Sequence, residues 1–239
     1  MVKQTISKAE GKKLKLLVDH FEANRKSFEL ILNQLVGYVQ ASKSLTPYIH
    51  SLKWRVKDAD HLKDKLIRNL KRAKEEGRNF DITTDNLFSK INDLAGFRIL
   101  HLYTRQIEPI NKALKDLLAE AQFPIIEGPR ARSWDDESRA YFKQIGIKSE
   151  NSPTMYTSVH YVIEANTRTK YTCEIQVRTL MEEVWGEVDH RINYPYATDS
   201  LHCLEQIKVL ARVTSGCTRL VDSIFRSHEQ DGKQTTGGK

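Results

Sequence analysis

Apolar residues recur at the spacing of an amphipathic helix along four stretches of the chain. The first helix need not be continuous, and the second can be capped by Asp60 at its start and by Gly77 at its end. Pro109 is tolerated only in a first helical turn, which places the start of the third helix near Glu108. The four predicted helices cover Lys12–Val39, Asp60–Glu76, Gln106–Ala121 and Ser200–Arg226.

Four shorter stretches, rich in apolar and aromatic residues, predict β-strands. The last two are separated by Asn-Thr-Arg-Thr and form the best hairpin signal in the chain. Thr179 then caps a fifth helix, with Glu182 completing a capping box. Residues 128–153 have no steady period and predict a long loop with room for one short element. The predicted strands are Gly96–Tyr103, Phe123–Gly128, Tyr156–Ala165 and Lys170–Thr179.

This order of elements predicts an α/β (α+β) fold in which helices flank one mixed sheet. The chain has 239 residues, 39% of them hydrophobic, which suits one sizeable core with a helical extension at each end. Residues 228–239 predict a disordered tail. The chain has neither a signal-peptide h-region nor a run of about 18 apolar residues, so we expect a cytoplasmic protein without a membrane segment.

Cysteine usage and charge narrow the class of protein further. Cys173, Cys203 and Cys217 form no CxxC pair, which argues against a disulfide framework or a structural zinc site. The net charge of +7 and the pI near 9.2 favour an anionic partner, either a nucleotide or a nucleic acid. Charge alone does not choose between these two.

Both strands of the predicted hairpin alternate, so that one face of each carries polar side chains. If the two polar rows face the same way, they line one surface. Taken alone, Glu174 and Arg178 can also be an exposed cross-strand pair, Tyr156 can be a core aromatic, and His160 can be structural. The rows contain Tyr156, Ser158, His160, Glu174, Gln176 and Arg178.

Two acids and a group of cations add candidate chemistry to this surface. Asp93 precedes the strand that carries Arg98, and with Glu174 it can hold Mg²⁺, because hard cations prefer carboxylate oxygens. Upstream cations can neutralise a triphosphate, and a guanidinium can stack on a base. In plainer interpretations, Asp93 is a turn residue and the cations form a solvated basic face. These upstream cations are Arg55, Lys57 and Lys65.

Four motifs in order, RVKDADHLKDK, DLAGFR, YTSVH and EIQVRT, followed by WGEVDHRINY, resemble the synthetase domain of the RelA/SpoT family of alarmone synthetases. The resemblance runs from about Trp54 to Tyr194 and implies a nucleotidyltransferase-like fold. It divides the chain into an N-terminal helical extension (1–50), a synthetase domain (51–197), a C-terminal helix (198–227) and the tail (228–239).

The resemblance also implies a reaction, in which the β,γ-pyrophosphate of ATP moves to the 3′-hydroxyl of GDP or GTP to give ppGpp or pppGpp. Asp93 and Glu174 would be the catalytic, Mg²⁺-binding pair. Two arginines would sandwich the adenine of ATP, and Tyr156 would stack on the acceptor base. The residues implied for ATP are Arg55, Lys57, Lys65 and Arg98, and those for the acceptor are Tyr156, Ser158, His160, Gln176 and Arg178.

Two positions depart from the family pattern and leave alternatives open. Met155 stands where the family usually has a glycine before the stacking tyrosine, so the acceptor is open. His61 stands where the family commonly has serine, which changes a phosphate contact without abolishing donor binding. The alternatives are a toxin-type relative that modifies tRNA 3′ ends or adenine nucleotides, and a non-catalytic basic RNA-binding module.

The regions outside the motifs suggest what accompanies the synthetase domain. The hydrolase domain of bifunctional relatives uses a His-Asp pair, whereas no His-Asp dipeptide occurs here and only residues 1–53 precede the motifs. We therefore expect no hydrolase activity. The helices at both ends carry apolar stripes, and such helices build oligomers in related small synthetases, so we expect a homo-oligomer.

Overall fold

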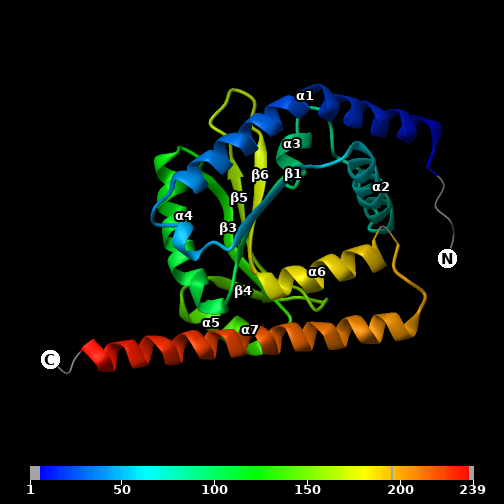
Figure 1. The fold of residues 1–239 in the computed structure, drawn as a ribbon. Helices are drawn as coiled ribbons and strands as arrows, with labels where there is room; N and C mark the ends of the chain where they lie inside the picture. The colour runs from blue at the N-terminus through cyan, green and yellow to red at the C-terminus, as the bar shows by residue number, and fades with distance from the viewer. Residues whose placement is uncertain (1–5, 195, 237–239) are drawn as a thin grey trace.

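The computed structural model describes residues 6–194 and 196–236, and within them a six-stranded sheet forms the centre of the fold (Figure 1). The strand order is β1-β2-β6-β5-β3-β4, in which β2/β6 and β3/β4 pair in parallel and the other neighbours pair antiparallel. This confirms the predicted mixed sheet and hairpin. The strands are β1 (Ser51–Val56), β2 (Ala95–His101), β3 (Ile125–Ser133), β4 (Lys148–Asn151), β5 (Thr157–Glu164) and β6 (Thr172–Thr179).

Helices surround this sheet, and the longest two lie at the ends of the described chain (Figure 1). None of the described helices is both long and apolar enough to cross a membrane. The α-helices are α1 (Lys8–Ala41), α2 (Ala59–Glu75), α3 (Leu87–Lys90), α4 (Ile107–Glu120), α5 (Asp136–Gln144), α6 (Leu180–Asn193) and α7 (Leu201–Thr236). Two short 3₁₀ helices, η1 (Thr46–Tyr48) and η2 (Thr104–Gln106), precede β1 and α4.

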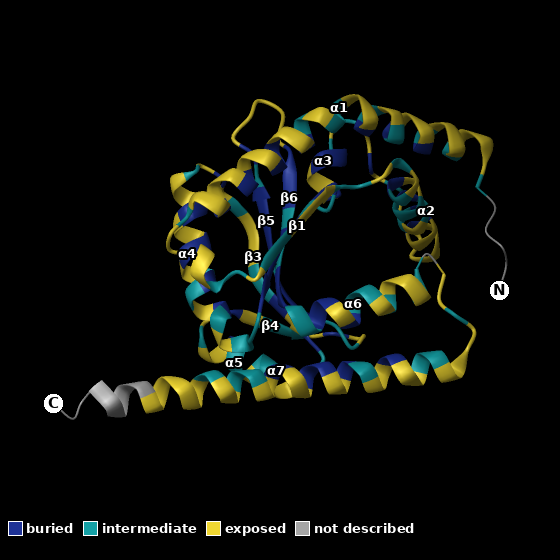
Figure 2. Cartoon of the chain, in the orientation of Figure 1, coloured by how far each residue is buried: buried dark blue, intermediate teal, exposed yellow. Residues whose placement is uncertain are grey.

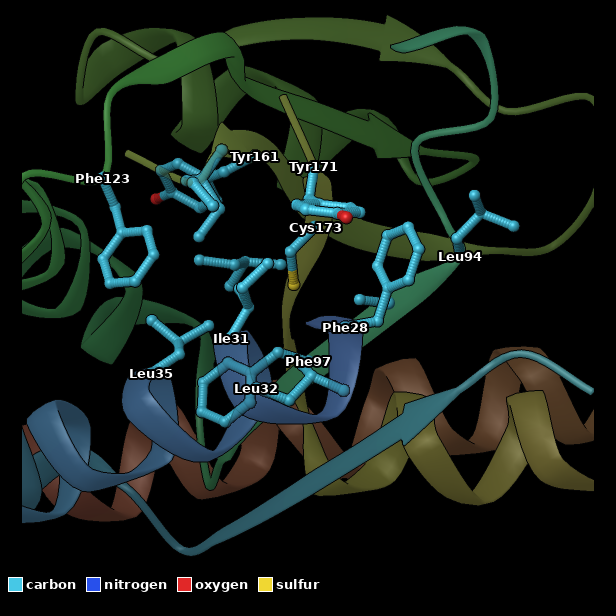
Figure 3. Close-up of a cluster of buried hydrophobic side chains, with 14 of the residues drawn as sticks. Phe28, Ile31, Leu32, Leu35, Leu94, Phe97, Phe123, Tyr161, Tyr171 and Cys173 are labelled. Atoms are coloured by element: carbon cyan, nitrogen blue, oxygen red, sulfur yellow. The ribbon is translucent and has the colours of Figure 1, made fainter. Parts of the chain in front are cut away.

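Helix α1 covers one face of the sheet and shares its hydrophobic core. It is continuous, and Ser7 and Glu10 close a capping box at its start. Phe28 and Leu32 of α1 lie beside Phe97 of β2 and Cys173 of β6 in Figure 3. Because α1 and the sheet bury one common cluster, the N-terminal segment is packed as part of the domain core.

Helix α7 packs along α6 through a second, smaller cluster around Trp185 and Ile207. The buried part of α7 runs beside α6, whereas its part toward the C-terminus is exposed (Figure 2). Thr214 and Thr218 are buried, and the Thr218 hydroxyl donates to the Thr214 carbonyl at 3.0 Å. These two threonines therefore face inward, where each buried hydroxyl needs a hydrogen-bond partner.

The prediction of a long loop at residues 128–153 is wrong, because β3 continues to Ser133 and is followed by α5 and β4. In this part of β3, Ala131 and Ser133 are buried and alternate with arginines, so hydrophobicity alone hides the strand period. Gly128 has φ +96°, and a Cβ there would lie 2.4 Å from the His160 carbonyl oxygen. This glycine allows β3 to bend close to β5 and continue.

Two further boundaries differ from the predictions. Asp58, and not Asp60, is the N-cap residue of α2, because the helix begins at Ala59. The predicted tail at 228–239 is wrong for residues 228–236, which continue α7, and residues 237–239 lie outside the described part. Helix α7 extends beyond its last packed residues, because a helix that is already nucleated adds further turns at little cost.

Candidate functional site

A row of polar residues crosses the sheet on the face opposite α1. Each member is the cross-strand partner of the next, and the members come from β1, β2, β6, β5 and β3 in that spatial order. The hairpin prediction that the two polar rows share a surface is thus confirmed for its central pair, His160 and Gln176. The row is Lys53, Arg98, Gln176, His160 and Arg130.

Two adjoining pockets lie over this face. The larger, of about 760 Å³, is bounded by β1, β2, β6 and α6, and the smaller, of about 230 Å³, lies toward β3 and β5. Asp93 and Glu174 line both pockets and therefore mark their junction. Predicted residues in the larger pocket are Arg55, Lys57, Arg98, Tyr156, Gln176 and Arg178, and those in the smaller are Lys65 and His160.

Asp93 lies in the turn that precedes β2, between two lysines. Its Oδ2 is 3.0 Å from the Nζ of Lys57, and its Oδ1 is 2.7 Å from the Nζ of Lys65. Burial alone would raise the pKa of Asp93, but the charges of Lys65 and Lys57 outweigh burial and lower it. Asp93 is therefore ionised at neutral pH.

Glu174 projects from β6 into the same junction. The Nδ1 of His160 lies 2.9 Å from its Oε1, and the Nε2 of Gln176 donates to its Oε2 at 2.9 Å. Burial and the nearby Asp93 charge act to raise the pKa of Glu174, but the hydrogen bond and charge of His160, with Gln176, lower it. Two ionised carboxylates thus meet where the pockets join.

This pair fits a hard divalent cation. Mg²⁺ is commonly bound by one or two carboxylates and completes its shell with water and phosphate oxygens. The part of the chain that the structure describes has no group of three or more His, Cys, Asp or Glu side chains arranged to hold a metal ion. Asp93 and Glu174 are the carboxylates that could bind such a cation together with a phosphorylated ligand.

An open floor lies between Arg55 and Glu174. Gly96 is the register partner of both, so no side chain stands between them. Arg98 borders this floor, and its Nε donates to the Oε1 of Gln176 at 3.0 Å. A planar ligand therefore has room beside two guanidiniums in the larger pocket.

Tyr156 lines the larger pocket. Its Oη is 3.2 Å from the Nε2 of His160, and burial raises the pKa of its phenol. The guanidinium of Arg178 lies over the ring at 5.8 Å from the centroid, and Trp185 packs at 6.5 Å. Tyr156, His160 and Glu174 form one hydrogen-bonded chain, which ends at the junction of the pockets.

Two predicted acceptor residues have different surroundings from those expected. Ser158 is buried, and its hydroxyl donates to the Val177 carbonyl, so it lies beneath the site without lining the larger pocket. Arg178 does line that pocket, but it is buried and paired with Glu183. The strand alternation predicts which face a side chain takes, whereas the helix packed above it decides whether that face is open.

The sequence interpretation missed several residues near the site. Lys90, Arg130 and Arg132 line the smaller pocket, and Glu183 lies behind Arg98 and Arg178. The alternation of Arg130 and Arg132 with buried residues was the available signal for a strand with a charged face. No comparable signal existed for Glu183, because two consecutive glutamates in a helix usually face solvent.

The stability of the folded protein should depend on pH because of Glu182, the neighbour of Glu183. Burial and the Asp135 charge raise its pKa from the ordinary 4.5 to about 8, against the effect of Arg178. The folded protein then keeps a proton that the unfolded chain releases, so the free energy of unfolding falls as pH rises from about 4.5 to about 8. We expect Glu182→Gln to raise Tm by several degrees more at about pH 9 than at about pH 6. Thermal denaturation over this range tests it, and a difference independent of pH would contradict it.

The fold and the site together define an α+β domain with a nucleotide-sized cleft, lined by cations and by carboxylates that include Asp93 and Glu174. Residues 54–199 match the family model described as a region found in RelA/SpoT proteins. This match spans more than half of the chain, and the chain belongs to the RelA/SpoT family.

The relatives of this chain include a GTP pyrophosphokinase and a small alarmone synthetase. GTP pyrophosphokinase YwaC of Bacillus subtilis (strain 168) is 26% identical over 159 residues, and the match covers 63% of this chain and 61% of that protein. The small alarmone synthetase 1 of B. subtilis bound to its product pppGpp has a TM-score of 0.58 at 19% identity, and covers 92% of this chain and 98% of that one. The structure of the same enzyme bound to AMPCPP has a TM-score of 0.56 at 18% identity, and the match covers 92% of this chain and 99% of that one. These structures share the fold.

Proposed function

We propose that this protein transfers the β,γ-diphosphate of ATP to the 3′-hydroxyl of GDP or GTP. The 3′-oxygen would attack the β-phosphorus, the bond from that phosphorus to the α,β-bridging oxygen would break, and AMP would leave. The observation that carries this proposal is the position of Asp93 and Glu174 at the junction of two cation-lined pockets. The names of the relatives, a GTP pyrophosphokinase and a synthetase with pppGpp or AMPCPP, support it.

The donor would occupy the larger pocket. Its adenine would lie on the open floor beside Arg55 and Arg98, because planar guanidiniums stack on bases. Lys57 and Lys65 would contact its phosphates, since both already point at Asp93. Mg²⁺ would supply charge neutralisation of the phosphates in the transition state.

The acceptor would reach the same junction from the other side. Its base would stack on Tyr156, and its 5′-phosphates would lie in the smaller pocket near Lys90, Arg130 and Arg132. Glu174 would accept the proton of the attacking hydroxyl, and the hydrogen bond to His160 keeps its carboxylate oriented. In-line transfer needs positioned groups and charge neutralisation, which this arrangement provides without a protein nucleophile.

Radiolabelled ATP tests the proposal when it is incubated with Mg²⁺ and one acceptor at a time. We expect labelled product with GDP or GTP, and none after Mg²⁺ is replaced by EDTA. The basic smaller pocket and Met155 before Tyr156 also suit other acceptors. Deacylated tRNA and the adenine nucleotides are therefore each tested in a separate reaction. Transfer only to one of these would replace the guanine acceptor. RNA binding without transfer in any arm would mean a non-catalytic module.

Two substitutions at Tyr156 should distinguish its role in acceptor binding from its role in catalysis. Tyr156→Ala should raise the acceptor KM about 10-fold or more, because base stacking contributes about 1–3 kcal/mol. Tyr156→Phe keeps the ring and should keep most of the affinity, with a smaller loss in kcat because His160 loses its contact with the Tyr156 hydroxyl. Steady-state kinetics with the acceptor varied measure both effects. An equal KM for Ala and wild type would remove Tyr156 from the acceptor site.

The partner proposed for the outer side of the protein is a second copy of this chain. The face of α7 turned away from α6 carries Val209, Val213, Leu220 and Ile224, each more than half exposed. Such a stripe is costly to leave in water, and pairing with another copy would cover it. We expect light scattering to give a homo-oligomer, which Val213→Lys with Leu220→Lys should dissociate. A wild-type monomer at all concentrations would contradict this.

A further inference from the structure

Glu183 is a buried carboxylate that pairs with cations from three neighbouring strands. It lies in the first turn of α6, and its side chain is 4% exposed. Its Oε1 accepts from the Nζ of Lys53 in β1 at 2.8 Å and from the Nη1 of Arg98 in β2 at 3.2 Å. Its Oε2 forms an ion pair with Arg178 in β6. One carboxylate therefore fixes two guanidiniums that line the larger pocket.

The position of Arg178 is restricted from a second side. Gly186 lies one turn beyond Glu183 in α6, and a Cβ at this glycine would come within 2.8 Å of the Nη1 of Arg178. Glycine inside a helix costs about 1 kcal/mol relative to alanine, so its presence requires a reason such as this close approach. The ring of Tyr156 faces the same guanidinium. Arg178 is thus enclosed by Glu183, Gly186 and Tyr156.

The charge of Glu183 persists over the whole working range of pH. Burial alone would raise its pKa, but Arg178, then Lys53 and Arg98, lower the pKa to about 2. Removing this charge would leave cations in a partly buried site without their common partner, which is costly and frees their side chains to reorient.

We infer that Glu183 is a positioning residue that couples the two nucleotide sites. It holds Arg98 where the donor base binds and Arg178 behind the tyrosine that carries the acceptor base. This inference rests on the proposed function for the assignment of the two sites. The pairing itself, between one carboxylate and both guanidiniums, stands on the geometry.

Three variants separate coupling from a merely structural role. Glu183→Gln removes the charge shared by both guanidiniums, and we expect the KM values for ATP and for the acceptor to rise together, each by about 10-fold. Gly186→Ala meets Arg178, whose tip can move, and does not meet Arg98, so the acceptor KM should rise several-fold more than the ATP KM. Glu187 pairs with Arg98 and Lys53 and forms no ion pair with Arg178, so Glu187→Gln should affect the ATP KM alone.

Binding and NMR measurements complete the test. The affinity for a non-hydrolysable ATP analogue and for the acceptor is measured by calorimetry, and the Nε–Hε signals of Arg98 and Arg178 are followed by NMR. Glu183→Gln should shift and broaden both arginine signals, and Gly186→Ala only that of Arg178. If Glu183→Gln lowers Tm but leaves both signals and both affinities unchanged, the inference is wrong. A wild type that binds neither nucleotide would overturn the proposed function, while the arginine signals still decide the role of Glu183.

Discussion

Asp93→Asn and Glu174→Gln are each expected to reduce kcat by about 10²–10³ while the fold remains intact. Each change keeps the size of the side chain and removes one of the two charges at the junction of the pockets. Preorganised electrostatic groups at a reacting centre have effects of this order when one is removed. For Glu174 the loss also includes the group proposed to accept the hydroxyl proton.

The two variants should differ in their Mg²⁺ requirement and in their stability. Asp93→Asn leaves Lys57 and Lys65 without their shared counter-charge, so we expect a higher Mg²⁺ concentration at half-maximal rate and a changed Tm. Glu174→Gln keeps a hydrogen-bond acceptor for His160. Initial rates over a Mg²⁺ titration, with circular dichroism as the folding control, measure both. Undiminished turnover by folded Glu174→Gln would refute the central proposal.

Arg98→Ala is expected to raise the KM for ATP by about 10- to 100-fold, with a much smaller effect on the acceptor. The reason is the loss of a planar cation beside the adenine, an interaction of about 1–3 kcal/mol. Arg98→Lys should recover little, because an ammonium group cannot stack as a plane or bridge Gln176 and Glu183 as the guanidinium does.

Arg55→Ala provides the matched comparison from the other side of the open floor. Arg55 is exposed and is not among the cations that pair with Glu183, so its replacement should weaken ATP binding without moving the NMR signal of Arg178. Calorimetric titration of each variant with the ATP analogue and with the acceptor gives the two affinities separately. Equal losses for both ligands in Arg55→Ala would contradict the assignment of this pocket to the donor.

The sequence alone was sufficient for the main elements of the fold. Helical period predicted α1, α2, α4 and most of α7, and strict alternation with a short connection predicted the β5/β6 hairpin. These signals are local, since they depend on residues a few positions apart that share one face. The quoted motifs likewise predicted the family to which the chain belongs.

The sequence also predicted much of the chemistry at the site. Asp93 and Glu174 were paired as metal ligands, and the structure brings both to one junction. That they bind Mg²⁺, and that the arginines and lysines contact ATP, stay predictions until they are measured. Residue type was the available signal at these two positions, because hard cations prefer carboxylate oxygens.

Only the tertiary structure decided the surroundings of the polar side chains. Arg130 and Arg132 join the site because β3 lies next to β5, a pairing between segments about 30 residues apart that no local period encodes. Ser158 is buried, and its hydroxyl donates to the Val177 carbonyl. Glu183 becomes the shared partner of three cations because α6 packs against β2 and β6. Burial and charge pairing depend on what packs above a residue, and the packing partners come from distant parts of the chain.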